Sequence, residues 1–103
     1  MYLTVLCTVP DSASAQKIAQ ILVQEGLAAC VNLLPGITSV YRWQGEVQEN
    51  PELLLLIKTT HKRYEALQAR IKELHPYEVP EIIALKIEAG LKNYLDWITQ
   101  STR

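Results

Sequence analysis

One short segment, residues 75–81, concentrates side chains that could do chemistry. It contains, in order, His75, Pro76, Tyr77, Glu78, Val79, Pro80 and Glu81. Each proline biases the residue before it toward extended backbone and donates no backbone hydrogen bond, so neither a helix nor a regular central strand is expected there. We therefore expect a stiff connector that holds an imidazole, a phenol and two carboxylates at nearly fixed spacing. It is either a structural corner or a functional site.

The composition disfavours several classes of function. The chain has 103 residues, of which 49% are hydrophobic, which suits one folded domain over residues 1–103. The formal net charge is -1 and there is no basic stripe, so nucleic acid is not expected as a partner. The longest apolar run, Leu53 to Ile57, is far shorter than the roughly 20 residues of a membrane-spanning helix, and no secretory signal is visible. We predict a cytoplasmic protein with no membrane partner.

Residue types that serve in enzymes do not form an active-site pattern here. No serine has the sequence context of an activated nucleophile, and the only histidines are His61 and His75. A glycine-rich phosphate loop is also missing. Glu78 and Glu81 could do acid–base work, but a rigid surface corner explains this pair as well. We predict no enzymatic activity.

Hydrophobic periodicity predicts the elements that must position the connector. Apolar alternation predicts a strand over 2–9, with Leu3, Val5, Cys7 and Val9 on one face. Helical spacing predicts helices over 12–25, from residue 60 or 61 to 74, and over 93–101. Extended segments are expected over 28–43, 46–60 and 82–87. This order predicts an α+β fold, the β-α-β-β-α-β ferredoxin-like sandwich with an extra C-terminal helix.

The two central extended segments are predicted to form one long hairpin. A turn at Gln44-Gly45 would place Val31 near Lys58 and Pro35 near Leu54. About 15 extended residues span about 50 Å, whereas a domain of this size has a radius of gyration of about 13 Å. We therefore expect the hairpin to project past the body of its own subunit.

The run from Leu53 to Ile57 is apolar on both faces of its strand, which is typical of strands buried on both sides. In the ferredoxin-like plan the two main helices cover one face, and the C-terminal helix is too short to cover the other alone. The projecting hairpin also needs a surface to pack on. These features predict a close-packed homo-oligomer, cyclic if its contacts close. The alternative is that the C-terminal helix folds across the second face.

Six short motifs, in order along nearly the whole chain, carry a family resemblance. They are Val5 to Thr8, Leu27 to Asn32, Pro35-Gly36, Ser39 to Gly45, Ile57 to Thr60 and His75 to Ile82. Each motif alone is weakly specific, but their order in a chain of this length is strongly so. Together they resemble the CutA divalent-cation tolerance family. The resemblance implies a ferredoxin-like subunit in a tight homotrimer, and a cytoplasmic role linked to copper and other divalent cations.

The resemblance also implies a metal site. Cys7 matches the thiol that the family's copper-binding pattern places in the first strand, and His75 matches the histidine before the Pro-Tyr pair. Some members carry a second histidine where this chain has Leu74, so Glu78 and Glu81, or neighbouring subunits, would have to complete the ligand set. Thiolate and imidazole suit copper or zinc. Copper or another divalent cation is therefore the expected ligand, although not one needed for folding.

Structural roles could explain the same two side chains. Cys7 shares a strand face with apolar residues, which favours a buried core thiol, and the spacing of Cys7 and Cys30 matches no zinc motif. His75 could instead be a helix C-terminal residue whose charge favours the helix end. The sequence leaves both alternatives open.

A second group of candidate residues comes from the hairpin and the connector. It comprises Tyr41, Trp43, Lys58, Tyr77 and Glu81. If the hairpin reaches a neighbouring subunit, these residues could line an inter-subunit pocket for a small molecule or a partner protein. The nitrogen-regulatory signalling proteins, which are ferredoxin-like trimers with such clefts, offer an analogy at the level of fold only. Alternatively, Tyr41 and Trp43 are packing anchors at a trimer contact. The sequence thus predicts a metal-tolerance protein or, as the alternative, a signalling or scaffold trimer.

Overall fold

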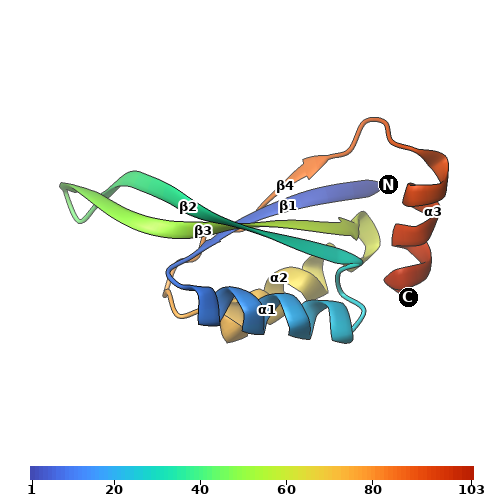
Figure 1. Cartoon of the computed structure of the whole chain (residues 1–103), viewed down its shortest axis with the longest axis horizontal. Coiled ribbons are helices and arrows are strands. Elements are labelled where there is room, and N and C mark those ends of the chain that lie inside the picture. Colours follow the sequence, from blue (N-terminus) through green and yellow to red (C-terminus); the bar gives the residue numbers. More distant parts are fainter.

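The computed structural model, which describes residues 1–103, is a four-stranded antiparallel sheet with two helices on one face and a third at one end (Figure 1). Its elements are β1 (Tyr2–Val9), α1 (Ser12–Gln24), β2 (Cys30–Trp43), β3 (Glu46–Thr60), α2 (Tyr64–Leu74), β4 (Ile83–Lys86) and α3 (Lys92–Ser101), with a single 3-10 turn, His61–Arg63, leading into α2. The strand order is β2-β3-β1-β4. This order and the helix positions correspond to the ferredoxin-like plan, and the predicted α+β class is confirmed. No helix is long and apolar enough to cross a membrane.

The core lies between the sheet and helices α1 and α2, as the periodicity predicts. The predicted inward face of β1 is at most 4% exposed at each of its four positions. The facing residues are Ala15, Ile18 and Leu22 of α1, Leu55 and Ile57 of β3, and Leu67 and Ile71 of α2, all fully buried. Burying each large aliphatic side chain stabilises the fold by about 1.5–3 kcal/mol. This layer therefore fixes which face of the sheet the helices cover.

The hairpin register corrects one detail of the prediction. Beyond the bulge, the register agrees with a turn at Gln44-Gly45, and Trp43 pairs with Glu46. Nearer the body, the predicted pairs are wrong by one residue: Val31 pairs with Ile57, not Lys58. The cause is a register shift between Leu34 and Ile37, where β2 holds one residue more than β3. Within this bulge, Gly36 has φ 82, a backbone conformation that side chains with a Cβ disfavour.

The hairpin formed by β2 and β3 projects beyond the body of the subunit, as predicted (Figure 1). The molecule measures 44 × 25 × 23 Å along its principal axes, and the long dimension follows the hairpin. In Figure 1 its outer half extends past the ends of α1 and α2. Most hairpin residues between Leu34 and Asn50 are accordingly exposed.

The second face of the sheet is largely open. Helix α3 lies at the end of the sheet and does not fold across this face, so the alternative raised by the sequence is not found (Figure 1). A 2.6 Å hydrogen bond between the hydroxyl groups of Tyr2 and Thr99 joins α3 to β1.

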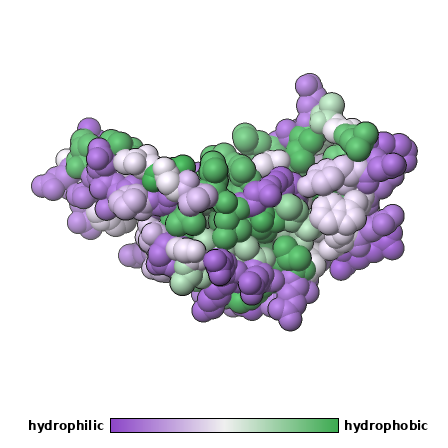
Figure 2. Space-filling view, in the orientation of Figure 1, coloured by the Kyte–Doolittle hydropathy of each residue, from purple (hydrophilic) through white to green (hydrophobic).

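On the open face, Leu34, Ile83 and Leu85 are about half exposed, at 48%, 50% and 53%. Hydrophobic residues gather across the middle of the molecule in Figure 2.

Candidate functional site

His75 fixes the start of the connector between α2 and β4. Its Nε2 lies 2.7 Å from the carbonyl oxygen of Thr8, and its Nδ1 accepts a 3.0 Å hydrogen bond from the backbone N–H of Tyr77. Because Nδ1 accepts, the neutral ring carries its proton on Nε2 and donates to Thr8. The side chain is only 7% exposed. His75 therefore holds the connector against the end of β1 through Nε2 and fixes the backbone of the connector through Nδ1.

Tyr77 reaches from the connector to the hairpin. Its hydroxyl donates a 2.7 Å hydrogen bond to Oε2 of Glu52, and its ring centroid lies 4.8 Å from that of His75. Burial, together with the hydrogen bond to the Glu52 carboxylate, raises the pKa of Tyr77 well above its usual value. The phenol therefore stays protonated and acts as a donor at neutral pH.

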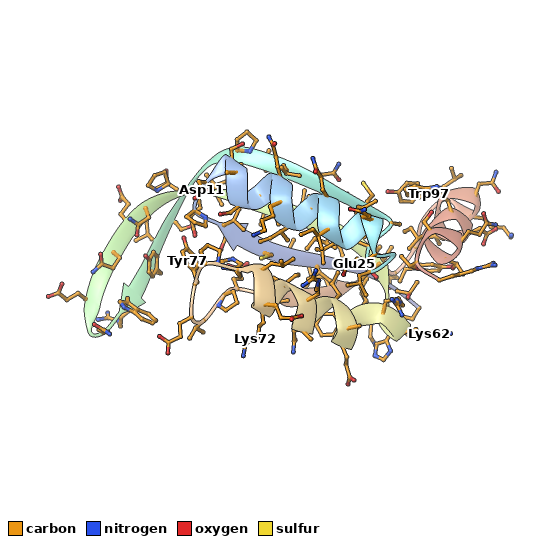
Figure 3. The ribbon with its side chains drawn as sticks, turned by 90° about the horizontal axis from the view of Figure 1, so that it is seen from below. Asp11, Glu25, Lys62, Lys72, Tyr77 and Trp97 are labelled. Atoms are coloured by element: carbon orange, nitrogen blue, oxygen red, sulfur yellow. The ribbon has the colours of Figure 1, made fainter.

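A hollow of about 660 Å³ lies between the connector and the outer half of the hairpin. We call it the hairpin hollow; it is lined by Thr8, Ser39, Val40, Tyr41, Trp43, Glu52, Pro76, Tyr77, Glu78, Val79 and Glu81. In Figure 3, Tyr77 lies near the base of the hairpin, whereas Trp97 lies at the opposite end of the molecule. The hollow is formed within a single chain, from the end of β1, the hairpin and the connector, which are distant in sequence.

The structure brings four of the five predicted pocket residues to this hollow and leaves one outside. Tyr41, Trp43, Tyr77 and Glu81 line it, but Lys58 does not. Lys58 lies at the body end of β3, where its ammonium group contacts the side-chain oxygen of Asn32. Lys58 lies six residues from Glu52, and six residues of extended strand span about 20 Å. The strand pairing of the hairpin, taken alone, does not show that Lys58 is distant from the connector.

Charge in the hollow is entirely negative. The lining includes Glu52, Glu78 and Glu81 and no lysine, arginine or histidine. None of these carboxylates forms an ion pair within the chain. Glu52 is 7% exposed, whereas Glu78 and Glu81 are exposed. The hollow therefore combines aromatic walls with a negative charge that the chain itself does not balance.

The predicted metal ligands do not come together as one group within a chain. Cys7 is fully buried on the helix-covered face, and its thiol donates a weak 3.8 Å hydrogen bond to the carbonyl of Thr8. Burial, with a smaller effect from nearby glutamates, raises the pKa of Cys7 to about 12, so the thiolate that binds metals is disfavoured. His75 already uses both ring nitrogens. No three His, Cys, Asp or Glu side chains are close enough together to hold a metal ion.

Glu52 is the main residue of the hollow that the sequence analysis missed. One signal was available: Glu52 alternates with Leu54 and Leu56, so it is a charged residue on the same strand face as two leucines. A carboxylate in that position needs a polar partner. Its partner, Tyr77, comes from a segment 25 residues away. Alternation could indicate the unusual charge but not the identity of that partner.

The fold and this hollow define a class of protein: a ferredoxin-like α+β domain with a projecting central hairpin and an acidic, aromatic hollow between that hairpin and the connector. Within this class, a family model described as the CutA1 divalent ion tolerance protein matches residues 3–101. The chain belongs to the CutA divalent-cation tolerance family.

Relatives and solved structures agree with this membership. The divalent-cation tolerance protein CutA of Thermus thermophilus is 58% identical over 98 residues, covering 95% of each chain. A Thermus thermophilus structure superposes with a TM-score of 0.98 at 56% identity and full coverage of both chains. A chloroplastic CutA of Arabidopsis thaliana is 48% identical over 101 residues, and this chain spans 56% of its length. An Archaeoglobus fulgidus structure, titled as a periplasmic divalent cation tolerance protein, is 35% identical with a TM-score of 0.97, covering all of both chains.

Proposed function

We propose that this protein binds divalent cations, copper among them, as a homotrimer and contributes to metal-ion tolerance in the cytoplasm without catalysing a reaction. The observation that carries the proposal is the unbalanced negative charge of the hairpin hollow, where Glu52, Glu78 and Glu81 have no basic neighbour in the lining. The names of the relatives, which refer to divalent-cation tolerance, agree with it. Carboxylate oxygens are good ligands for hard divalent cations, and imidazole adds affinity for copper and zinc.

The predicted ligands differ in how easily a cation would reach them. Glu78 and Glu81 are exposed and need no rearrangement. His75 would have to release the Thr8 carbonyl or the Tyr77 N–H, and Cys7 would have to leave the core. We therefore propose that Glu78 and Glu81 bind first, with the remaining ligands supplied by a neighbouring subunit or by rearrangement of His75 and Cys7.

Calorimetric titration of the reduced protein with Cu²⁺ and with Zn²⁺ tests the cation site. The double variant Glu78→Gln, Glu81→Gln should bind the cation at least about tenfold more weakly, which corresponds to a loss of about 1.4 kcal/mol of binding free energy. The matched control, Glu65→Gln, Glu88→Gln, removes the same charge from two other exposed positions and should bind normally. Equal affinity in the two variants would contradict the site. A second comparison, with Cys7→Ser, His75→Ala, determines whether the buried pair contributes.

The homotrimer is supported by the open sheet face. Exposed apolar residues of β2 and β4 continue onto half-buried leucines of β1 and β3, which leaves a hydrophobic surface without a cover in one chain (Figure 2). The projecting hairpin offers a second contact surface. Size-exclusion chromatography with light scattering should give three times the chain mass of 11.7 kDa. A monomer mass at micromolar concentration would refute the assembly.

The alternative function is a signalling or scaffold trimer that binds a small molecule or a partner protein in the hollow. The specific observation in its favour is the volume of about 660 Å³ with Tyr41, Trp43 and Tyr77 in the lining, which lies in the range of small-molecule sites. A thermal-shift screen of metabolites would separate it from metal binding, because a ligand of the folded state raises the unfolding midpoint.

A further inference from the structure

We propose that the hairpin hollow binds an organic ammonium ion of the amine or polyamine class. This inference rests on the alternative function above and names its ligand chemistry. It follows from three features that meet in the hollow: a buried carboxylate without a cation, aromatic rings with exposed surface, and a volume far larger than one metal ion needs.

The buried carboxylate is the first argument. Glu52 is 7% exposed and accepts one hydrogen bond, from the neutral hydroxyl of Tyr77 to Oε2. Its other oxygen, Oε1, has no protein partner and is accessible to solvent. A buried carboxylate is costly unless a cation balances it. The chain places none in the lining, so a cationic ligand would supply the missing charge.

The aromatic side chains are the second argument. Tyr41, Trp43 and Tyr77 line the hollow and are 42%, 47% and 37% exposed. Both tyrosine hydroxyls already donate, Tyr41 to Asn50 at 2.6 Å and Tyr77 to Glu52 at 2.7 Å. What these residues still offer a ligand is mainly their ring surface. Ring faces, above all that of tryptophan, attract organic cations.

The strand register brings these two features together. Ile37 pairs with Glu52 and Tyr41 with Gln48, so Tyr41 and Trp43 share a sheet face with Glu52. Glu78 and Glu81 approach from the connector side of the hollow. A ligand between hairpin and connector would thus meet carboxylates and ring faces at the same time.

The size and ligand set distinguish an organic cation from a bare metal ion. Metal ions such as Ca²⁺ and Mg²⁺ take several oxygen ligands at short distance, and no three acidic, histidine or cysteine side chains are grouped to provide them. Aromatic faces donate no lone pair to such an ion. A hollow of about 660 Å³ instead accommodates an alkyl chain with one or more ammonium groups.

The test uses putrescine, a dication at neutral pH, and the neutral diol of the same chain length. Calorimetry on the intact protein should show saturable binding of putrescine and at least about tenfold weaker binding of the diol. The chain has two tryptophans, so in a Trp97→Phe background the fluorescence of Trp43 should change with the same midpoint. Similar affinities for both probes would overturn the proposal, because they would indicate apolar binding without recognition of charge.

Two variants locate the site. Glu52→Gln keeps an acceptor for the Tyr77 hydroxyl but removes the charge, and should weaken putrescine binding about tenfold. Trp43→Leu, at an exposed position, should weaken it about fivefold or more. Glu88→Gln, outside the lining, is the charge-matched control and should bind normally. If Glu52→Gln fails to fold by circular dichroism, Trp43→Leu decides; unchanged affinity there overturns the proposal.

Zinc titration of the same variants separates this inference from metal binding. Trp43→Leu should leave zinc affinity unchanged while it lowers putrescine affinity. If zinc binds but putrescine does not, the ammonium site is refuted and the cation-tolerance proposal stands. If putrescine binds and zinc does not, the cation-tolerance proposal is refuted and the ammonium site stands. A basic side chain of a second copy that fills the hollow would abolish putrescine binding, and that outcome also refutes the inference.

Discussion

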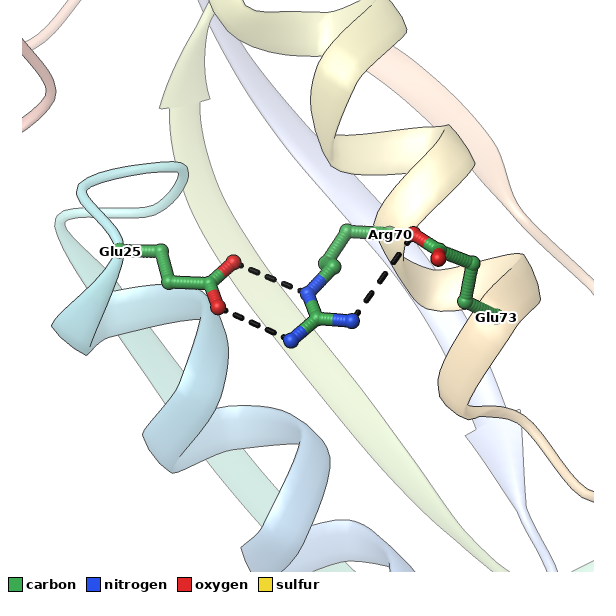
Figure 4. Close-up of polar contacts among 3 residues, drawn as sticks. All are labelled: Glu25, Arg70 and Glu73. Carbon is green, nitrogen blue, oxygen red and sulfur yellow. Dashed lines mark hydrogen bonds and ion pairs between the residues drawn. The ribbon is translucent and has the colours of Figure 1, made fainter.

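The helix-covered side of the sheet and the hairpin hollow differ in whether a carboxylate has a cationic partner within the chain. At the covered side, the carboxylate of Glu25, just after α1, accepts hydrogen bonds of 2.9 Å from both Nε and Nη2 of Arg70 on α2 (Figure 4). Glu73 approaches the same guanidinium at 3.8 Å. In the hollow, Glu52 is much more buried and yet has only a neutral tyrosine hydroxyl. The chain thus pairs the carboxylate that water already solvates and leaves the buried one without a cation.

This difference separates a region completed within the chain from one that is not. The covered side pairs buried polar groups within the chain; for example, the buried Thr59 hydroxyl donates to the carbonyl of Leu27 at 2.7 Å. The exception is Nε of Arg63, in the 3-10 turn before α2, which is buried without a partner. The hollow retains negative charge and partly exposed aromatic rings. Buried polar groups are normally satisfied, so the hollow is where an external group is expected.

The largest effect is expected in the alkylation rate of the Cys7 thiol, which is buried on the helix-covered side. Cys7 is fully buried and Cys30 is partly exposed. Since only the thiolate reacts and burial raises the pKa of Cys7 to about 12, iodoacetamide should alkylate Cys7 on the order of a thousandfold more slowly in the native protein than in urea. Peptide mass spectrometry over time measures both sites. Native labelling of Cys7 as fast as that of Cys30 would show that the covered side is not closed.

The next effect concerns His75, which joins the two regions. His75→Ala removes one buried and one partly buried hydrogen bond and leaves a cavity, so the free energy of unfolding should fall by about 2–4 kcal/mol. Urea denaturation at constant protein concentration measures the change. The matched control is His61→Ala, an exposed histidine in the 3-10 turn, which should change stability little. Similar losses in both variants would mean that His75 is not a structural link.

A smaller effect is expected from Tyr77→Phe. This change removes the one hydrogen bond that Glu52 accepts and leaves a buried carboxylate unsatisfied, at an expected loss of about 1–3 kcal/mol. Tyr64→Phe is the control, because the Tyr64 hydroxyl bonds to Gln68 in an exposed pair. Chemical denaturation of both variants gives the comparison. If Tyr64→Phe costs as much, the hollow does not differ from the surface.

The smallest effect is expected from Glu25→Gln on the covered side. Hydrogen bonding to Arg70 lowers the pKa of the Glu25 carboxyl in the folded state. A lowered pKa contributes stability above the unfolded-state pKa of about 4.3, and that contribution disappears as pH falls through the lower folded-state value. Glu25→Gln should therefore be slightly less stable than the parent at pH 7 and equal to it in strong acid. A difference that persists at low pH would assign the effect to packing.

Much of the fold was predictable because side-chain periodicity is a local property. Alternation over β1 identifies four of its five buried positions, all except Thr8, and helical spacing identifies the buried face of α1, because each pattern repeats within one element. The connector was also predictable as a stiff segment, since proline acts on its immediate neighbours. The candidate site was only partly predictable. Lys58, which was predicted for an inter-subunit pocket, lies outside the hollow of the single chain, and Glu52 was missed, because neither position follows from local pattern.

The sequence alone determined which segments are strands and helices and which faces of β1, α1 and α2 are apolar. The tertiary structure decided which side chains meet in the hollow. Had the pairing of Leu34 with Leu54 continued outward without a bulge, Val40 and Arg42 would share the face of Glu52. The one extra residue at the bulge turns Tyr41 and Trp43 to that face instead. Because side chains alternate with a period of two, one residue of register decides whether the buried carboxylate faces a guanidinium or aromatic rings.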